Sequence, residues 1–248
     1  MRIKWADQKV HDWSSDCTVC VWCLEGFNLL NTISLTSAIC HIGVSCDSTF
    51  LLVACEDNSV HVRSLTTGSD VHCLLGHHGK VTSLCFARDN CRCVVGCHDG
   101  KIYIYDIHSA KLLQTLGGHS DAVVSLQTQQ QDTFLISAGG SKILVWNFYS
   151  KRNEGTRAKT CKVNTHRDVV TCVAVSRDGN LAVSGSKDHL VKAWHLSSGE
   201  THTTLEGHSG PITCVAFAPN GLFVVSGSED MTLRVWGLTL GLIVSTFK

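Results

Sequence analysis

The sequence predicts an all-β fold, a β-propeller assembled from copies of one four-stranded unit. Two observations support this prediction. First, a short β-like run ends at an aligned position six times, at intervals of roughly forty residues, a period typical of repeat architectures. These positions are Trp22, Arg63, Tyr105, Trp146, Trp194 and Trp236. Second, each copy carries short apolar or alternating runs separated by turn residues, and no helical period competes with them. Four strands per copy are typical of a propeller blade.

The last copy shows the unit most clearly. Its four runs cover residues 212–218, 222–226, 232–236 and 242–247. Asn-Gly, Glu-Asp and Gly-His pairs, which are common in turns, separate the runs. The preceding copy repeats the order with runs at 169–176, 181–184 and 191–194. Both copies therefore predict a complete four-stranded blade.

The first copy is shorter. About twenty residues precede Trp22, whereas a complete unit needs about thirty at this point. The runs 10–13, 18–22 and 28–35 supply the second, third and fourth strands, so the innermost strand is predicted to be missing. We therefore expect five complete blades and one partial N-terminal blade over 1–35. Because no spare strand is available to cover an exposed edge, the chain is predicted to be an excerpt or short isoform of a larger array. Whether six blades close alone is left open.

The repeats resemble those of WD40 proteins, which run from a Gly-His pair to a Trp-Asp pair. Three copies open with the Gly-His pair, one has the histidine alone, and one keeps the closing aspartate. These residues are Gly76-His77, Gly118-His119, Gly207-His208, His166 and Tyr105-Asp106. At the closing end, four copies keep the tryptophan without the aspartate, at Trp22, Trp146, Trp194 and Trp236. The resemblance covers essentially all of residues 1–248, which are expected to form a single propeller region.

The resemblance also implies a structural role for a buried polar tetrad. In WD40 proteins an aspartate binds the histidine, the histidine binds a serine or threonine, and that hydroxyl binds the tryptophan N–H. Two copies fit this chain, with His166, Ser184, Asp188, Trp194 in one and His208, Ser226, Asp230, Trp236 in the other. A serine, a histidine and an aspartate can also suggest a hydrolase. Because the set is repeated, we expect it to stabilise blades, with no catalytic residue among its members.

Three copies depart from the tetrad. The copy ending at Arg63 keeps Asp57 but has Leu35 where the histidine is expected. Gly140 takes the aspartate position before Trp146, and Val95 and Cys97 take the serine positions before Tyr105. These copies are expected to lack the full network.

The composition does not favour nucleic acid or lipid as a partner. The formal net charge is zero, and 17% of the residues are charged. A protein that binds the phosphate backbone usually has a strongly basic surface. No apolar stretch approaches about 18 residues, and the first residues do not resemble a signal peptide. We therefore expect no nucleic-acid or membrane partner and a cytoplasmic location.

The fourteen cysteines raise the possibility of a metal site. Cys17, Cys20 and Cys23 alternate faces if they share one strand, so they cannot converge on a metal. Cys91, Cys93, Cys97 and His98 form a tighter group, which would need tetrahedral geometry to bind zinc. Free cysteines are often small buried hydrophobes, and this interpretation is favoured. We expect no metal and no cofactor.

One segment is predicted to contact a partner. Residues 149–165 lie within the one interval that is longer than the others. They carry five basic residues against the single acid Glu154, and these are Lys151, Arg152, Arg157, Lys159 and Lys162. A basic loop on a rigid scaffold can bind acidic or phosphorylated surfaces. The alternative is a solvated loop without a partner.

The sequence lacks the common catalytic motifs, including the phosphate-binding loop, the Gly-x-Ser-x-Gly motif and the His-Glu-x-x-His motif. The favoured function is a non-enzymatic scaffold that docks partner proteins or peptides. Residues 191–213 also resemble the WD region of NACHT and WD repeat-domain proteins. That resemblance implies the sensing or autoinhibitory part of a cytosolic signalling ATPase whose nucleotide site lies outside this chain. A third hypothesis is a substrate receptor for a modifying enzyme, which predicts a pocket lined by several arginines. The partner, the face used and the oligomeric state are not predicted.

Overall fold

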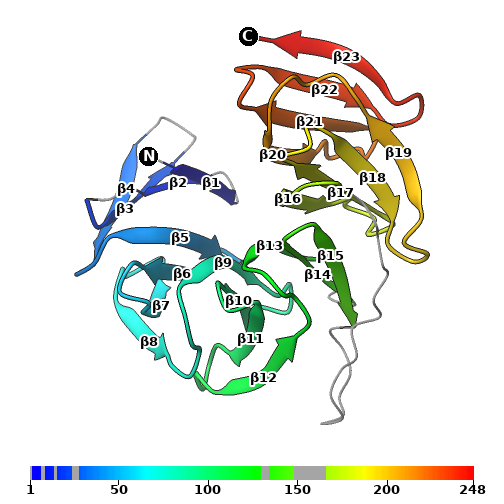
Figure 1. Ribbon diagram of the computed structural model, residues 1–248. Helices are drawn as coiled ribbons and strands as arrows, with labels where there is room; N and C mark the ends of the chain where they lie inside the picture. Colours follow the sequence, from blue (N-terminus) through cyan, green and yellow to red (C-terminus); the bar gives the residue numbers. More distant parts are fainter. Residues whose placement is uncertain (1, 7–8, 14–15, 24–27, 130–133, 148–165) are drawn as a thin grey trace. The chain divides into compact units, whose positions relative to one another are not determined.

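Every regular element in the described part of the chain is a β-strand. The computed structural model describes residues 2–6, 9–13, 16–23, 28–129, 134–147 and 166–248 (Figure 1). These residues contain no helix long and apolar enough to cross a membrane. The chain divides into two compact units, Met1–Thr115 and Leu116–Lys248, and each is described by itself below.

The first unit contains two complete antiparallel sheets and most of a third. Their strands are β1 (Arg2–Ala6), β2 (Lys9–Trp13), β3 (Thr18–Cys23), β4 (Leu29–Ser34), β5 (Ile39–Val44), β6 (Phe50–Cys55), β7 (Val60–Ser64), β8 (Asp70–Leu74), β9 (Val81–Phe86), β10 (Arg92–Cys97) and β11 (Lys101–Asp106). The sheets follow chain order as β1–β4, β5–β8 and β9–β12. The boundary between the units falls inside β12 (Leu112–Gly117).

The second unit contains three further sheets. Their strands are β13 (Val123–Thr128), β14 (Phe134–Gly139), β15 (Lys142–Asn147), β16 (Val170–Val175), β17 (Leu181–Ser186), β18 (Val191–His195), β19 (Thr201–Leu205), β20 (Ile212–Phe217), β21 (Phe223–Ser228), β22 (Leu233–Gly237) and β23 (Leu242–Phe247). Sheets β16–β19 and β20–β23 have four strands each, and sheet β13–β15 has three. The fourth strand expected after Trp146 would fall in 148–165, outside the described residues.

Repeated antiparallel sheets of four sequential strands confirm the predicted all-β fold of propeller blades. The repeat extends to fine detail. The innermost strand of five sheets shifts register against its neighbour near its start, at Ile39/His41, Val81/Ser83, Val123/Ser125, Val170/Cys172 and Ile212/Cys214. Each of the six aligned positions from Trp22 to Trp236 lies in the third strand of its sheet.

The prediction of a partial first blade is wrong. The missing innermost strand is present as β1, which pairs with β2 from Arg2↔Trp13 to Ala6↔Lys9. No Gly-His pair precedes this strand, which is why the repeat pattern did not reveal it. Its residues Arg2, Ile3, Lys4 and Trp5 alternate between polar and apolar, the period of a strand.

Apolar side chains fill the space between neighbouring sheets of the second unit. One cluster joins Val183 and Ala193 of sheet β16–β19 to Ile212 and Trp236 of sheet β20–β23. The Ile212 side chain lies directly above Gly185, where a Cβ would collide with it. The Thr171 hydroxyl donates a 2.6 Å hydrogen bond to the Ile212 carbonyl. The two sheets are therefore matched both in shape and in polar contacts.

Candidate functional site

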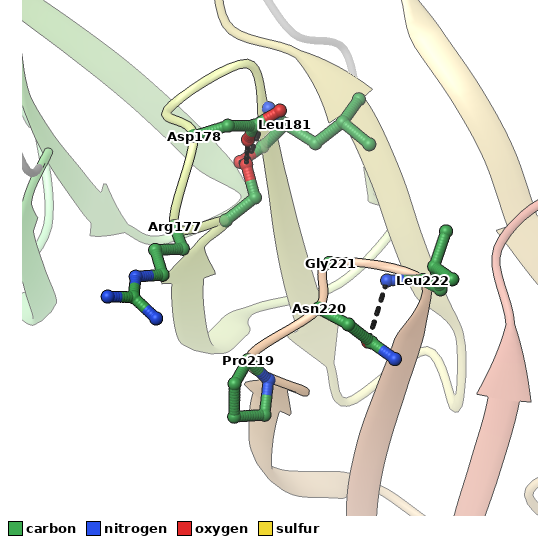
Figure 2. Close-up of a pocket in the computed structure, with 8 residues that line it drawn as sticks. Arg177, Asp178, Leu181, Pro219, Asn220, Gly221 and Leu222 are labelled. Carbon is green, nitrogen blue, oxygen red and sulfur yellow. Dashed lines mark hydrogen bonds between the residues drawn. The ribbon is translucent and has the colours of Figure 1, made fainter.

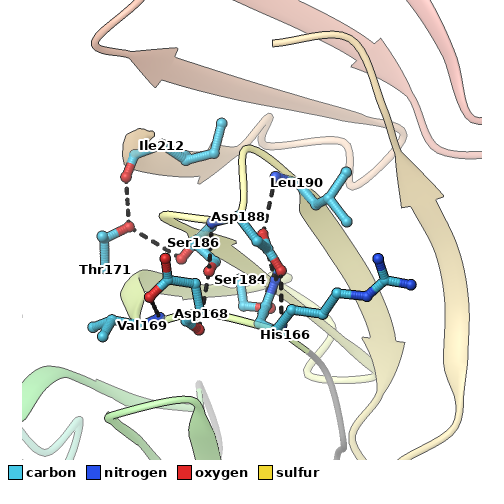
Figure 3. Close-up of polar contacts among 11 residues, drawn as sticks. His166, Asp168, Val169, Thr171, Ser184, Ser186, Asp188, Leu190 and Ile212 are labelled. Carbon is cyan, nitrogen blue, oxygen red and sulfur yellow. Dashed lines mark hydrogen bonds and ion pairs between the residues drawn. The ribbon is translucent and has the colours of Figure 1, made fainter. Parts of the chain in front are cut away.

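The predicted tetrad of sheet β16–β19 gathers at one end of its strands (Figure 3). His166 precedes β16, Ser184 lies in β17, and Asp188 lies in the turn before β18. The His166 ring approaches Ser184 Oγ with Nε2 at 2.8 Å and Asp188 Oδ2 with Nδ1 at 2.9 Å. The Arg167 N–H also donates to Asp188, at 3.0 Å. The Ser184 hydroxyl and the Arg167 N–H therefore meet the buried Asp188 carboxylate and His166 imidazole in one network.

The tetrad of sheet β20–β23 is complete. Trp236 Nε1 donates to Ser226 Oγ at 2.8 Å, and that hydroxyl lies 2.7 Å from His208 Nε2. His208 Nδ1 lies 2.7 Å from Asp230 Oδ2. The Thr232 hydroxyl donates a further bond of 2.6 Å to Asp230. Every polar member of the network has a partner.

The tetrad of sheet β16–β19 differs in one bond. Trp194 is completely buried, yet its Nε1 has no hydrogen-bond partner among the described residues. The expected bond from Trp194 to Ser184 is therefore absent. Here the tryptophan contributes its apolar volume, and the polar network ends at the serine.

The charges of these networks follow from their surroundings. Burial lowers the pKa of His166, so its ring is neutral at pH 7. Burial alone would raise the pKa of Asp230, but hydrogen bonds from Thr232, His208 and Ser209 outweigh it and hold that pKa below its usual range. The pKa of Asp188 is lowered in the same way, with Arg167 as its main donor. Each network therefore pairs a charged carboxylate with histidine and backbone donors.

The networks share the Asp-His-Ser hydrogen-bond order of a catalytic triad, but their serines are inaccessible. The side chains of Ser184 and Ser226 have no solvent exposure, and the Ser226 hydroxyl already accepts the Trp236 N–H. A nucleophile must reach the substrate, and these hydroxyls cannot. Their arrangement ties the start of each sheet to its second and third strands.

A third network, in sheet β13–β15, was not anticipated from the sequence. His119 Nε2 lies 2.7 Å from Ser137 Oγ, which accepts a 2.8 Å bond from Trp146 Nε1. The hairpin between β14 and β15 is one residue shorter than its counterparts, since Ser137 stands nine residues before Trp146 and Ser226 stands ten before Trp236. Gly140 replaces the aspartate, as predicted, and His119 Nδ1 has no partner among the described residues. The signal in the sequence is the spacing from the histidine, since Ser137 follows His119 by 18 residues, as Ser226 follows His208.

His119 makes the stability of the second unit depend on pH. Burial lowers the pKa of this histidine from 6.5 to about 4, with a smaller opposing effect from the Gly139 backbone. Between these two values the unfolded chain binds more protons than the folded chain, so stability is full above pH 6.5 and falls as the pH drops towards 4. We expect a loss of about 2 kcal/mol between pH 7 and pH 4.5, measured by urea unfolding.

The His119→Asn variant tests this assignment. Asparagine can still bond the Ser137 hydroxyl but does not titrate. The pH dependence between 6.5 and 4.5 should become shallower, while the contribution of His166, which has the same sign, is retained. Identical slopes for the variant and the parent chain would contradict the assignment.

The first unit uses different polar contacts. The Tyr105 hydroxyl lies 3.2 Å from His77 Nδ1, and Tyr103 donates to Asp99 at 3.1 Å. The Arg63 guanidinium makes two 2.7 Å bonds to Asp70 and one of 2.8 Å to the Ser34 carbonyl. Arginine at the tryptophan position therefore serves as a bridge between sheets β5–β8 and β1–β4.

The cysteines near position 95 are part of the core. Cys93 and Cys97 are fully buried, and burial raises the pKa of the Cys97 thiol to about 12. A metal-bound cysteine must be a thiolate, which this environment disfavours. Within the ranges that the structure describes, no group of three or more His, Cys, Asp or Glu residues could hold a metal ion.

A cleft of about 490 Å³ lies on the surface of the second unit. It lies between the turn joining β16 to β17 and the corresponding turn joining β20 to β21 (Figure 2). Its walls are formed by Ser176, Arg177, Asp178, Leu181, Pro219, Asn220, Gly221 and Leu222. No local sequence pattern predicts this cleft, because its two turns, at Arg177 and Pro219, lie 42 positions apart in the chain. The five basic residues Lys151, Arg152, Arg157, Lys159 and Lys162 of the predicted partner loop lie outside the described residues.

Comparisons with known protein families agree with this geometry. Residues 58–185, slightly more than half of the chain, match a β-propeller family described as "Nucleolar protein 10-like, N-terminal domain". Residues 199–237 match "WD domain, G-beta repeat". The chain belongs to the WD40 β-propeller family. WD40 propellers are generally non-catalytic and act in protein interactions.

Several curated proteins are similar to this WD40 chain. The WD repeat domain-containing protein 83 homolog of Dictyostelium discoideum is 29% identical over 50% of this chain and 36% of its own length. The COMPASS component SWD3 of Saccharomyces cerevisiae is 26% identical over 71% of this chain and 60% of its own length. Pre-mRNA-processing factor 19 of Bos taurus is 27% identical over 66% of this chain and 32% of its own length. The matched regions therefore span less than two thirds of these relatives.

Proposed function

We propose that this chain is a non-enzymatic scaffold that docks a partner protein or peptide through exposed turns of its WD40 sheets. The observation that carries the proposal is the contrast between the buried tetrads and the exposed turns. The Ser184, Ser226 and His208 side chains are buried in structural networks, and the open cleft is lined by turns. Loops held by a rigid scaffold are common sites of binding.

The relatives add general support. By its name, SWD3 is a component of COMPASS, and pre-mRNA-processing factor 19 bears the name of a processing factor. Both are proteins in which a similar WD40 region forms part of a longer chain. For the present chain, docking of a partner is the function that these likenesses favour.

Site-specific photo-crosslinking tests the proposal. A photoreactive residue replaces Leu222 at the cleft, or Met231 at an exposed turn that does not line the cleft. A scaffold should give discrete covalent adducts in extracts at one or more turns, each lost when an excess of unlabelled chain competes. Absence of competed adducts at every turn, in a correctly folded protein, would argue against a scaffold function.

The two narrower hypotheses receive less support. A substrate receptor was expected to gather free arginines, but Arg63 is already bound to Asp70 and Ser34. The NACHT hypothesis rests on the resemblance of residues 191–213 and places its nucleotide site outside this chain. Neither is favoured over the general scaffold.

A further inference from the structure

The cleft of the second unit is formed by two equivalent hairpin turns of adjacent sheets. Arg177 occupies in one turn the place that Pro219 occupies in the other, and Asp178 corresponds to Asn220. Both turns end in a glycine with positive φ, 71° at Gly221 and 72° at Gly179. The two turns therefore have the same backbone path but present different side chains, which gives the cleft a charged side and an apolar side.

The charged side carries the Arg177 guanidinium. Arg177 is exposed and has no hydrogen-bond or ion-pair partner within the described part of the chain. Asp178, by contrast, accepts bonds from the Ser176 hydroxyl at 2.6 Å and from the Asn180 amide. These bonds keep the Asp178 carboxylate within its own turn. In Figure 2 the Arg177 side chain extends away from Asp178.

The opposite side is apolar. Leu222 has 56% of its surface exposed although it immediately precedes β21, and Pro219 of the same turn also lines the cleft. Exposed apolar side chains beside a free arginine form a surface that suits a mixed acidic and apolar segment.

We propose that this cleft binds an extended acidic segment of a partner protein, with one Asp or Glu carboxylate paired to Arg177 and an adjacent apolar side chain packed on Leu222 and Pro219. This inference rests on the proposed scaffold function and names the chemistry of the partner. The guanidinium can donate two parallel hydrogen bonds to one carboxylate, which fixes the register of the segment.

A carboxylate fits the charge of the cleft better than a phosphate. Phosphate carries nearly two negative charges and is usually bound by clusters of arginines. The cleft offers one free arginine, and the Asp178 carboxylate lies next to it in the chain. Hydrogen bonds from Ser176 and Asn180 keep the pKa of Asp178 low, so this repelling charge is present at neutral pH.

The turn that carries Arg177 is supported from the adjacent sheet. The Gln129 amide donates a 3.2 Å hydrogen bond to the Gly179 carbonyl, and Gln129 itself is buried. Gly179 N–H also closes the turn onto the Ser176 carbonyl at 2.9 Å. The arginine therefore projects from an ordered backbone, which reduces the entropy lost when a segment binds.

The test uses the full chain and three matched libraries of 12-residue peptides. The libraries share their apolar positions and differ at one position, which holds glutamate, phosphoserine or glutamine. Binding is measured by fluorescence anisotropy with the parent chain, Arg177→Glu and Arg167→Glu. Arg167 is exposed in the bend before β16 and does not line the cleft, so its variant carries the same change of net charge there. The variant retains the backbone N–H that Arg167 donates to Asp188.

The glutamate library should yield binders whose affinity falls at least tenfold in Arg177→Glu and less than twofold in Arg167→Glu, consistent with loss of one charge-assisted pair. A lysine peptide should restore binding to Arg177→Glu. Equal losses in both arginine variants, preference for phosphoserine, or no binders at all would overturn the inference. If competed crosslinks form at other turns while all libraries fail, the scaffold function stands and only the assignment of the cleft is lost.

Discussion

Replacing Asp230 by alanine should lower the free energy of unfolding by about 3–5 kcal/mol, because it leaves buried donors without an acceptor. The Asp230 carboxylate accepts bonds from His208, Thr232 and the Ser209 amide. Water cannot easily replace it, since only 6% of its side chain is exposed. Urea unfolding at pH 7, followed by tryptophan fluorescence, measures the loss.

Glu229→Ala provides the control for this prediction. Glu229 is exposed and adjacent to Asp230, so its removal changes the net charge by the same amount. Its variant should unfold within about 0.5 kcal/mol of the parent chain, as is usual for surface substitutions. Equal stability of the Asp230→Ala and Glu229→Ala variants would show that the network does not stabilise the sheet.

Replacing Gly185 by valine should cost about 3 kcal/mol or more, because it overfills the contact between two sheets. Even a single added Cβ would collide with the Ile212 side chain and would lie 2.9 Å from Cys172 Sγ. Valine adds two further methyl groups in the same space. The expected result is early urea unfolding together with loss of the cooperative transition shared by sheets β16–β19 and β20–β23.

Gly117→Ala serves as the matched control. Nothing lies within 4 Å of the Cβ that this substitution adds. Its stability should equal or slightly exceed that of the parent chain, since alanine restricts the unfolded chain more than glycine does. A similar loss in both variants would indicate a backbone effect of glycine replacement instead of a steric clash between sheets.

The repeated unit was predictable because its signals are local. Turn pairs such as Asn220-Gly221 and strand-ending tryptophans such as Trp236 recur at a fixed period, so the sequence predicts the order and approximate limits of most strands. The tetrad residues His208, Ser226 and Asp230 were predictable because the repeats resemble those of WD40 proteins, and the same spacing recurs at His166, Ser184 and Asp188.

Other features depend on contacts that no local pattern encodes. The first strand, β1, lacks the Gly-His pair that opens three of the other copies, and the network of His119 lacks the aspartate. The sequence pattern also does not distinguish Trp194, whose Nε1 has no partner among the described residues, from Trp236, whose Nε1 bonds Ser226. The cleft is formed by Arg177 and Leu222 from separate repeats, and only their packing in space brings them together.

The sequence separation of the residues that bond within and between sheets affects the order in which the chain folds. The contacts of the His208 network join residues at most 24 positions apart, whereas the Thr171 bond to Ile212 in the next sheet spans 41. Short sequence separations favour rapid formation, and longer ones are reached more slowly. Each sheet can therefore consolidate soon after its own third strand leaves the ribosome. Joining to the next sheet then waits until Ile212 of β20 has been made, 17 residues after His195 ends β18, or about one to three seconds of synthesis.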